Sequence, residues 1–244
     1  MFINYAHRGA SSYAPENTLA AFYKGLEMGA NGIETDVQRT LDGFLVLHHD
    51  DTALRTARAD KKISDLTLSE LRSLDFGSFF SPDFVNERIV TLEDFLCYFG
   101  GKPLHFAIEI KQDGIGDEVL AMCDDYLARE RFIITSFSID CILDLAKNEN
   151  PPALGYLAAA FDESHIAMLL DAGVGQYCPH APELDDNMME YLRGKGFSIR
   201  AWGVSDETVM LRALRLGVDG MTVNFPDKLN AALGQPGARS RAAL

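Results

Sequence analysis

Short apolar segments alternate with longer amphipathic segments along nearly the whole chain. The apolar segments are rich in β-branched and aromatic residues, and most of them end in polar residues, which is typical of buried strands. They predict strands over residues 2–7, 32–38, 104–111, 131–137, 152–157, 174–180, 197–203 and 219–223. The amphipathic segments predict helices over residues 17–29, 115–130, 138–148, 162–172, 185–195, 205–216 and 226–234. Repeated strand–helix units favour a TIM (β/α)8 barrel, although an open doubly wound sheet would give the same local pattern.

One strand–helix unit is interrupted. A further apolar run, FLVLHHD over residues 44–50, follows the strand at 32–38, and a polar stretch then extends to about residue 90. Within it Thr67 and Glu70 have the spacing of a helix capping box. We therefore expect a single domain over 1–234 with a small insertion after the second strand region, at about 51–90, above the barrel mouth. The small-residue tail at 235–244 is expected to be disordered.

Composition and charge narrow the class of protein. The 244 residues are 47% hydrophobic, which suits one large core, and the formal net charge is -14. Such a charge argues against nucleic-acid binding, and an anionic substrate would need a local cation. The chain shows no secretory signal pattern and no apolar window near the roughly 18 residues of a membrane span, so we expect a soluble cytoplasmic protein without a stable membrane anchor. Four cysteines without CxxC spacing fit reduced thiols.

Three carboxylates are expected to meet at one edge of the sheet. Glu34 and Asp36 are two residues apart on a predicted strand and so project from the same face, and Glu109 ends another strand. Each acid alone could be a solvated or ion-paired strand end. Together they need a cation, because Lys111 supplies only one positive charge against three negative charges. Oxygen ligands of this kind suit a divalent metal, Mg²⁺ or Ca²⁺.

Two histidines are candidates for proton transfer. His7 ends the first apolar run, and His49 ends the run at 44–50, after a turn that could bring it back toward the carboxylates. Two imidazoles on either side of a metal-bound anion suit general acid–base chemistry near neutral pH. His48 must point to the opposite face if the strand geometry holds. A buried structural role is favoured for His105. The remaining two histidines, His165 and His180, are left without a catalytic role.

Four further residues are candidates for contacts around the site. Arg8 can form paired hydrogen bonds with phosphate oxygens, although a surface ion pair is the alternative. Trp202 could line the pocket, or it could be ordinary core. Glu16 and Asn17 precede the first helix and are interpreted as supports for the loop that carries His7, with simple helix capping as the alternative.

Taken together, these motifs resemble the glycerophosphodiester phosphodiesterases. The shared residues are His7-Arg8-Gly9, Pro15-Glu16-Asn17-Thr18, Glu34-x-Asp36, Asp42-Gly43, His49-Asp50, Ser64-Asp65-Leu66-Thr67, Glu109-x-Lys111, Trp202, Gly217-Val218-Asp219-Gly220 and Phe225-Pro226-Asp227. The resemblance implies a TIM barrel with a small insertion and a divalent cation on Glu34, Asp36 and Glu109. It also implies an acid–base pair of His7 and His49, with Arg8 and Lys111 on the phosphate. Asn224 stands where the family often has an acid.

The reaction implied by this resemblance is hydrolysis of glycerophosphodiesters to sn-glycerol 3-phosphate and an alcohol. In the family, the glycerol 2-hydroxyl attacks phosphorus, and water opens the resulting cyclic phosphate. A phosphodiesterase acting on lysophospholipids is a close alternative, since FGSFFSPDFV at 76–85 is rich in phenylalanine. A non-catalytic phosphate-binding barrel would tolerate loss of a histidine or carboxylate, and an aldolase would need a Schiff-base lysine at a strand end. The sequence leaves open the headgroup, the metal, the order in which the histidines act and the oligomeric state.

Overall fold

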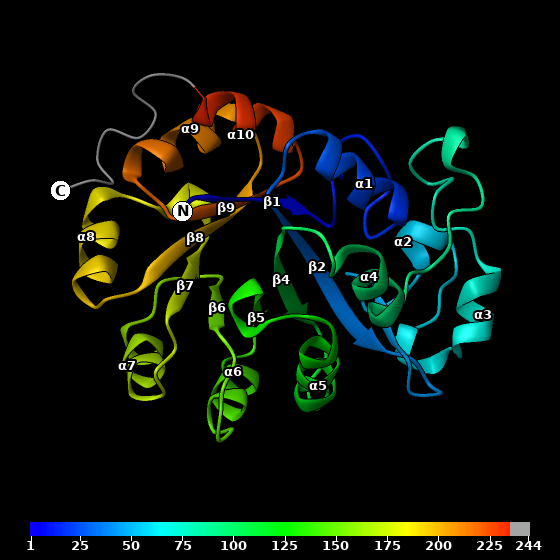
Figure 1. Cartoon of the computed structure of the whole chain (residues 1–244), viewed down its shortest axis with the longest axis horizontal. Helices are drawn as coiled ribbons and strands as arrows, with labels where there is room; N and C mark the ends of the chain where they lie inside the picture. Colours follow the sequence, from blue (N-terminus) through cyan, green and yellow to red (C-terminus); the bar gives the residue numbers. More distant parts are fainter. Residues whose placement is uncertain (235–244) are drawn as a thin grey trace.

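The computed structural model describes residues 1–234, and eight parallel strands form a closed barrel in it (Figure 1). The strands are β1 (Ile3–His7), β2 (Gly32–Arg39), β4 (His105–Ile110), β5 (Phe132–Ser136), β6 (Leu154–Ala158), β7 (Gln176–Pro179), β8 (Ser198–Val204) and β9 (Gly220–Val223). β1 pairs in parallel with both β2 and β9, which closes the sheet. The TIM barrel prediction is confirmed, and the open sheet is excluded. The predicted disordered tail lies outside the described residues.

Helices pack around the outside of the barrel (Figure 1). The helices that follow barrel strands are α1 (Leu19–Glu27), α4 (Leu92–Phe99), α5 (Gly116–Tyr126), α6 (Ile139–Ala146), α7 (Glu163–Asp171), α8 (Asp186–Gly194), α9 (Glu207–Leu216) and α10 (Pro226–Leu233). The sequence analysis missed α4. It begins after Thr91, whose hydroxyl accepts a hydrogen bond from the backbone N–H of Asp94, and it buries Phe95 and Phe99. Single-turn 3₁₀ helices cover Ile63–Asp65, Pro82–Phe84, Arg129–Arg131 and Ala181–Glu183.

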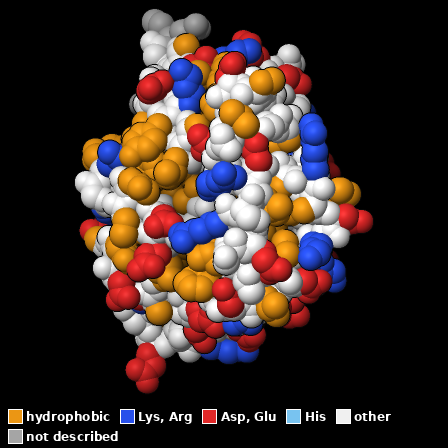
Figure 2. Space-filling view, turned by 90° about the vertical axis from the view of Figure 1, so that its right-hand side faces the viewer, with side chains coloured by type: hydrophobic (Ala, Val, Ile, Leu, Met, Phe, Trp, Pro, Cys, Tyr) orange, Lys and Arg blue, Asp and Glu red, His pale blue; other side chains and the backbone are white. Residues whose placement is uncertain are grey.

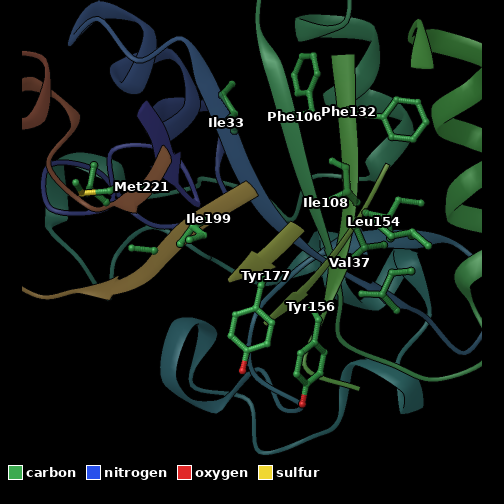
Figure 3. Packing of buried hydrophobic residues seen from close by; sticks show 14 of the residues in the cluster. Ile33, Val37, Phe106, Ile108, Phe132, Leu154, Tyr156, Tyr177, Ile199 and Met221 are labelled. Carbon is green, nitrogen blue, oxygen red and sulfur yellow. The ribbon is translucent and has the colours of Figure 1, made fainter. Parts of the chain in front are cut away.

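The main hydrophobic core lies between the strands and the surrounding helices (Figure 3). Alternation along β4 shows how the sequence fills it. Phe106 and Ile108 point outward into this core, whereas Ala107 belongs to a second, smaller cluster with Tyr5 and Ile133. Because side chains alternate along a strand, Glu109 lies on the same side as Ala107, toward the barrel interior. The period of two therefore directs an acidic residue inward at the end of β4.

The insertion, residues 51–90, lies to one side of the barrel and is drawn in cyan and blue-green in Figure 1. It follows β3 (Leu45–Leu47), which pairs antiparallel with β2, and it contains α2 (Leu54–Ala57) and α3 (Leu68–Ser73). Buried apolar residues join it to β3 as a separate core; they are Val46, Ala53, Ile63, Leu66, Leu68, Leu71, Phe76 and Ile89. The predicted capping box of Thr67 and Glu70 is present at the start of α3.

The apolar run at 44–50 is only partly a strand. β3 ends at Leu47, so His48 and His49 lie beyond it, and strand alternation does not decide where their side chains point. This corrects the extent of the predicted segment. The described residues 1–234 include no helix that is both long and apolar enough to cross a bilayer.

Candidate active site

Three buried carboxylates gather on β2 and β4, next to the end of β1. Glu34 and Asp36 come from β2 and Glu109 from β4, and the register pairs Asp36 directly with Glu109. One ligand oxygen from each carboxylate lies within 4.8 Å of the others. Among the residues that the structure describes, no hydrogen-bond donor reaches Oδ1 of Asp36. A buried oxygen without a donor, in a cluster of oxygen ligands, fits a hard divalent cation such as Mg²⁺ or Ca²⁺.

The pKa values of the three acids are pulled apart by their surroundings. Burial, followed by the charges of Asp36 and Glu109, raises the pKa of Glu34 well above its ordinary value. Burial and the charge of Asp36 likewise raise the pKa of Glu109 to about 7. Burial alone would also raise the pKa of Asp36, but the positive charges of Arg8, His49 and Lys111 outweigh it and lower that pKa. Without a cation the cluster therefore resists full ionisation, which is how crowded buried carboxylates behave.

His7 lies at the end of β1, beside this acidic cluster. Its Nε2 is 3.9 Å from Oε2 of Glu34, and its side chain is 29% exposed, so solvent reaches the ring. Its Nδ1 lies 2.5 Å from Oδ1 of Asn224, and because an amide oxygen only accepts, Nδ1 carries the proton and Nε2 is left free. Burial, and next the charge of Arg8, lowers the pKa of His7 to about 4, which keeps the imidazole neutral near pH 7.

Arg8, Glu16 and Asn17 form a polar layer around Asp36. Arg8 places Nε 3.1 Å from Oδ2 of Asp36 and donates from Nη1 to Oε1 of Glu16 at 2.8 Å. Asn17 donates from Nδ2 to the same Asp36 oxygen at 2.9 Å, and its backbone N–H donates to the carbonyl of Arg8. The N-cap of α1 is Thr18, so neither Glu16 nor Asn17 is a simple helix cap.

The backbone of the loop between β1 and α1 is strained near both of its ends. Arg8 and Asn17 both have φ of 55°, in the left-handed region that non-glycine residues seldom adopt. Such conformations persist where the surrounding contacts hold them, and they cluster at functional sites. Here the strain turns two polar side chains toward one buried carboxylate.

His49 lies in the segment between β3 and the insertion. Its Nδ1 donates to Oδ1 of Asp50 at 2.8 Å, which leaves its Nε2 free, and its side chain is 32% exposed. Asp50 in turn pairs with Arg55, which connects His49 to Glu16 of the polar layer. His48 is buried instead and bonds through Nε2 to the hydroxyl of Thr56. The two histidines thus have different environments, as expected, although the cause is not strand alternation.

Lys111 and Trp202 lie on a different part of the rim. Lys111 donates from Nζ to Oε1 of Glu109 at 2.7 Å, and this ammonium is also 5.6 Å from the ring centroid of Phe137. Phe137 meets Trp202 edge to face at 4.9 Å, and the Trp202 indole donates to the carbonyl of Ala158. The half-buried Trp202 therefore belongs to an aromatic wall at the mouth. His180, predicted to have no role, packs on its ring at 4.6 Å.

Three residues of the site were not predicted from the sequence. Asn224 was noted only as a departure from a family pattern, yet its Oδ1 accepts the hydrogen bond from Nδ1 of His7. Arg55, in the insertion, pairs with both Glu16 and Asp50. Arg200, fully buried in β8, donates to Thr222 and Gln176 and lies 5.2 Å from the ring centroid of Tyr5. The strand pattern could have indicated Arg200, because a charged residue inside an apolar strand needs an explanation.

A TIM barrel with acidic, cationic and imidazole groups at the carboxyl ends of its strands defines a class of enzyme that acts on anionic substrates. Comparison with known proteins narrows this class. Residues 7–228 match the model of the glycerophosphoryl diester phosphodiesterase family. A glycerophosphodiester phosphodiesterase from Caldanaerobacter subterraneus is 35% identical over 231 residues, covering 92% of this chain and 94% of the relative. One from Bacillus subtilis is 30% identical over 248 residues, covering 91% and 83%.

Solved structures agree with this family. The structure of an Oleispira antarctica phosphodiesterase in complex with the product sn-glycerol-3-phosphate is 26% identical, with a TM-score of 0.87 over 96% of this chain and 97% of that chain. A glycerophosphodiester phosphodiesterase from Thermotoga maritima is 29% identical, with a TM-score of 0.74 over 96% and 98%. The chain belongs to the glycerophosphoryl diester phosphodiesterase family. It is an enzyme that hydrolyses phosphoric diesters.

Proposed function

We propose that this enzyme uses a divalent cation to hydrolyse glycerophosphodiesters to sn-glycerol 3-phosphate and an alcohol. The observation that carries the proposal is the acidic triad of Glu34, Asp36 and Glu109, with His7 beside it at 3.9 Å. The product complex of the Oleispira antarctica relative supports a small phosphorylated substrate. The triad would hold Mg²⁺ or Ca²⁺, and the cation would supply positive charge for the nonbridging oxygens of the diester.

Arg8 and Lys111 would supply the remaining charge. A phosphodiester is a weak electrophile with one negative charge, so the attack on phosphorus is favoured where positive charge meets the charge that develops on its oxygens. Both side chains are mostly buried and already point at carboxylates of the triad. Their low exposure strengthens their interaction with an anion that enters the mouth. Trp202 would form an apolar wall for the substrate.

His7 and His49 would carry the protons. In the first step, the glycerol 2-hydroxyl forms a bond to phosphorus and gives its proton to one imidazole, while the bond to the headgroup oxygen breaks and the other imidazole protonates that oxygen. Water then opens the cyclic phosphate with the two roles reversed. In each histidine Nδ1 donates to a fixed acceptor, so Nε2 is the atom that is available for this exchange.

The test combines metal removal with histidine variants, using glycerophosphoethanolamine as substrate. A chelated preparation should lose turnover while its circular dichroism spectrum is retained, and activity should return when Mg²⁺ or Ca²⁺ is added back. His7→Ala and His49→Ala should each lose about 10²–10⁴-fold in kcat. His165→Ala is the matched control, because His165 lies on α7 and bonds to Tyr156. A full rate without metal, or in either variant, would contradict the corresponding role.

Activity on lysophospholipids is a second candidate, favoured by apolar side chains on the insertion. Phe80 and Val85 are exposed, at 38% and 56%, whereas Phe76 of the same segment is buried. Figure 2 shows the side of the molecule that carries the insertion, where hydrophobic side chains lie among charged ones. Packing of a lid is the alternative explanation for these residues. Assays with lysophosphatidylcholine beside water-soluble diesters would separate the two.

The proposal also includes a cytoplasmic location and one structural domain. All four cysteines are free thiols, a state that fits a reducing compartment. The insertion packs against β3 through its own apolar cluster and contributes Arg55 to the site, which favours one domain over 1–234. Limited proteolysis would test the domain assignment, because an independent insertion should be cleaved away from an intact barrel.

A further inference from the structure

We infer that Arg55 of the insertion is a positioning residue for His49 in the phosphodiester reaction. The inference rests on the acid–base role proposed above for His49. Arg55 lies on the short helix α2, outside the acidic triad, and its side chain is 44% exposed. Its guanidinium forms ion pairs with two carboxylates, those of Asp50 and Glu16.

One side of the guanidinium fixes the carboxylate that holds His49. Arg55 donates from Nε to Oδ2 of Asp50 at 2.7 Å and from Nη2 to Oδ1 at 3.1 Å. The same Oδ1 accepts a hydrogen bond from Nδ1 of His49 at 2.8 Å. A paired arginine–carboxylate contact sets the plane of the carboxylate as well as its position. The imidazole orientation is therefore tied to Arg55 through Asp50.

The other side of the guanidinium reaches the polar layer around Asp36. Arg55 donates from Nη1 to Oε2 of Glu16 at 2.6 Å and from Nη2 to Oε1 at 2.8 Å. Glu16 in turn accepts from Arg8, which pairs with the triad. A continuous chain of polar contacts thus runs from the proposed acid–base group to the acidic cluster, in the order His49, Asp50, Arg55, Glu16, Arg8 and Asp36.

The backbone around His49 is held by other groups. Gln38 donates from its amide nitrogen to the carbonyls of both His48 and Asp50 at 2.8 Å, and His48 bonds to Thr56. Loss of Arg55 should therefore leave the loop in place and release only the side chains of Asp50 and His49. Because Arg55 is partly exposed, solvent screens its ion pairs, and Arg55→Lys, which keeps the charge, should change the free energy of unfolding little.

Lysine cannot replace this arrangement. Arg55 uses four donor contacts on two carboxylates, and their geometry matches the planar fork of a guanidinium. An ammonium group keeps the charge but is a compact point on a flexible stem, without the fork needed to hold both carboxylates in fixed planes. Arg55→Lys consequently separates geometry from charge. Arg58→Lys is the matched control, because Arg58 is an exposed arginine three residues further along, at the end of α2.

The experiment measures kcat and KM on glycerophosphoethanolamine at a saturating concentration of the metal that gives the highest rate. Arg55→Lys should lose about 10–100-fold in kcat, with KM and the melting temperature close to those of Arg58→Lys. The Nδ1 proton of His49 should give a slowly exchanging downfield nuclear magnetic resonance signal in the wild type and lose it in Arg55→Lys. A stability role alone would lower the melting temperature without this signature.

A double variant separates this inference from the proposed function. In a His49→Ala background, Arg55→Lys should cause no further loss, because the group that it positions is gone. If His49→Ala keeps the full rate, the proposed acid–base role fails. If His49→Ala is inactive, the proposed function stands. The positioning role of Arg55 is then overturned by either of two results: a kcat of Arg55→Lys no lower than that of the wild type or of Arg58→Lys, or a further loss when Arg55→Lys is added to His49→Ala.

Discussion

The group that accepts the Nδ1 hydrogen bond of His7 is an amide rather than a carboxylate. Asn224 can fix the ring and its tautomer, but as a neutral group it adds no negative charge to stabilise an imidazolium. The contrast with His49 is direct, because His49 donates to the carboxylate of Asp50. The two imidazoles therefore differ in the charge of the group that accepts their Nδ1 hydrogen bond.

Removing the amide should impair catalysis rather than substrate binding. We expect Asn224→Leu, which keeps the shape but not the acceptor, to lower kcat about 10–100-fold with little change in KM, because the ring of His7 loses its orientation. Steady-state kinetics on a soluble glycerophosphodiester provide the measurement. Asn187→Leu, the same change at an exposed position on α8, is the control. Equal kcat values in the two variants would contradict a role for Asn224.

His105 should make stability depend on pH. Burial, followed by the charges of Arg200 and Arg131, lowers its pKa to about 4 in the folded protein, and its Nδ1 is hydrogen-bonded to the hydroxyl of Tyr5 at 2.8 Å. The unfolded chain binds a proton near pH 6.5 and the folded chain does not, so the free energy of unfolding falls as pH drops from about 6.5 to about 4.

The size of this loss is on the order of 2 kcal/mol for the half-buried ring. Urea unfolding at pH 7 and at pH 5 measures it. His105→Asn keeps an acceptor for Tyr5 and cannot be protonated, so we expect its stability to change less between the two pH values than that of the wild type. An identical pH dependence in the variant would assign the effect to other groups.

At the scale of the element, the first loop packs tightly on the first helix. Gly9 has φ of +83°, and a Cβ at this position would lie 2.4 Å from the backbone carbonyl carbon of Ala21 in α1. This close approach brings the loop that carries His7 and Arg8 onto the helix that follows the polar layer. Gly9 therefore meets a packing requirement against α1 in addition to the positive φ of its turn.

We expect Gly9→Ala to lower the free energy of unfolding by more than about 3 kcal/mol, because the methyl group meets backbone atoms that cannot move aside. Gly43→Ala is the matched control. Gly43 has φ of +88°, but a Cβ there would meet nothing within 4 Å, so the substitution should cost only about 1 kcal/mol. Denaturant unfolding compares them. Similar losses would show that φ alone, and not the contact with Ala21, decides the cost.

The sequence was sufficient to predict the barrel strands and the acidic residues of the candidate site, because both depend on local patterns. A period of two determines which face Glu34 and Asp36 share, and parallel strands bring their carboxyl ends to one edge. It was insufficient to predict α4, because this helix directly follows the polar stretch of the insertion. It was also insufficient for Arg55, since its contact with Glu16 spans 39 positions and depends on how the insertion folds back.

At the scale of the whole molecule, the cation should contribute to stability as well as to chemistry. The folded chain gathers three carboxylates that the unfolded chain does not hold together, so the proposed cation would bind the folded state preferentially. At a concentration of about 100 times Kd this stabilises the fold by about 2.7 kcal/mol, which corresponds to a rise in melting temperature of about 5–10 °C. The formal net charge of -14 makes nonspecific cation binding the effect that must be excluded.

Calorimetry with and without Mg²⁺ or Ca²⁺ measures this shift. Glu109→Gln should abolish most of it, because the variant keeps the shape of the side chain but removes a ligand charge. Glu130→Gln, an exposed change of the same kind, should leave the shift intact. If both variants respond to the metal as the wild type does, the cation binds elsewhere on the acidic surface.

Closure of the barrel brings the first and last described strands side by side at the candidate active site. β1 pairs with β9, and the bond between His7 and Asn224 spans 217 positions. During synthesis His7 would accordingly lack this contact, which the proposed role of its ring requires, until residue 224 has been translated. In a refolding experiment, recovery of turnover should lag behind recovery of the helical circular dichroism signal. The recovery of activity would then report when β9 docks against β1.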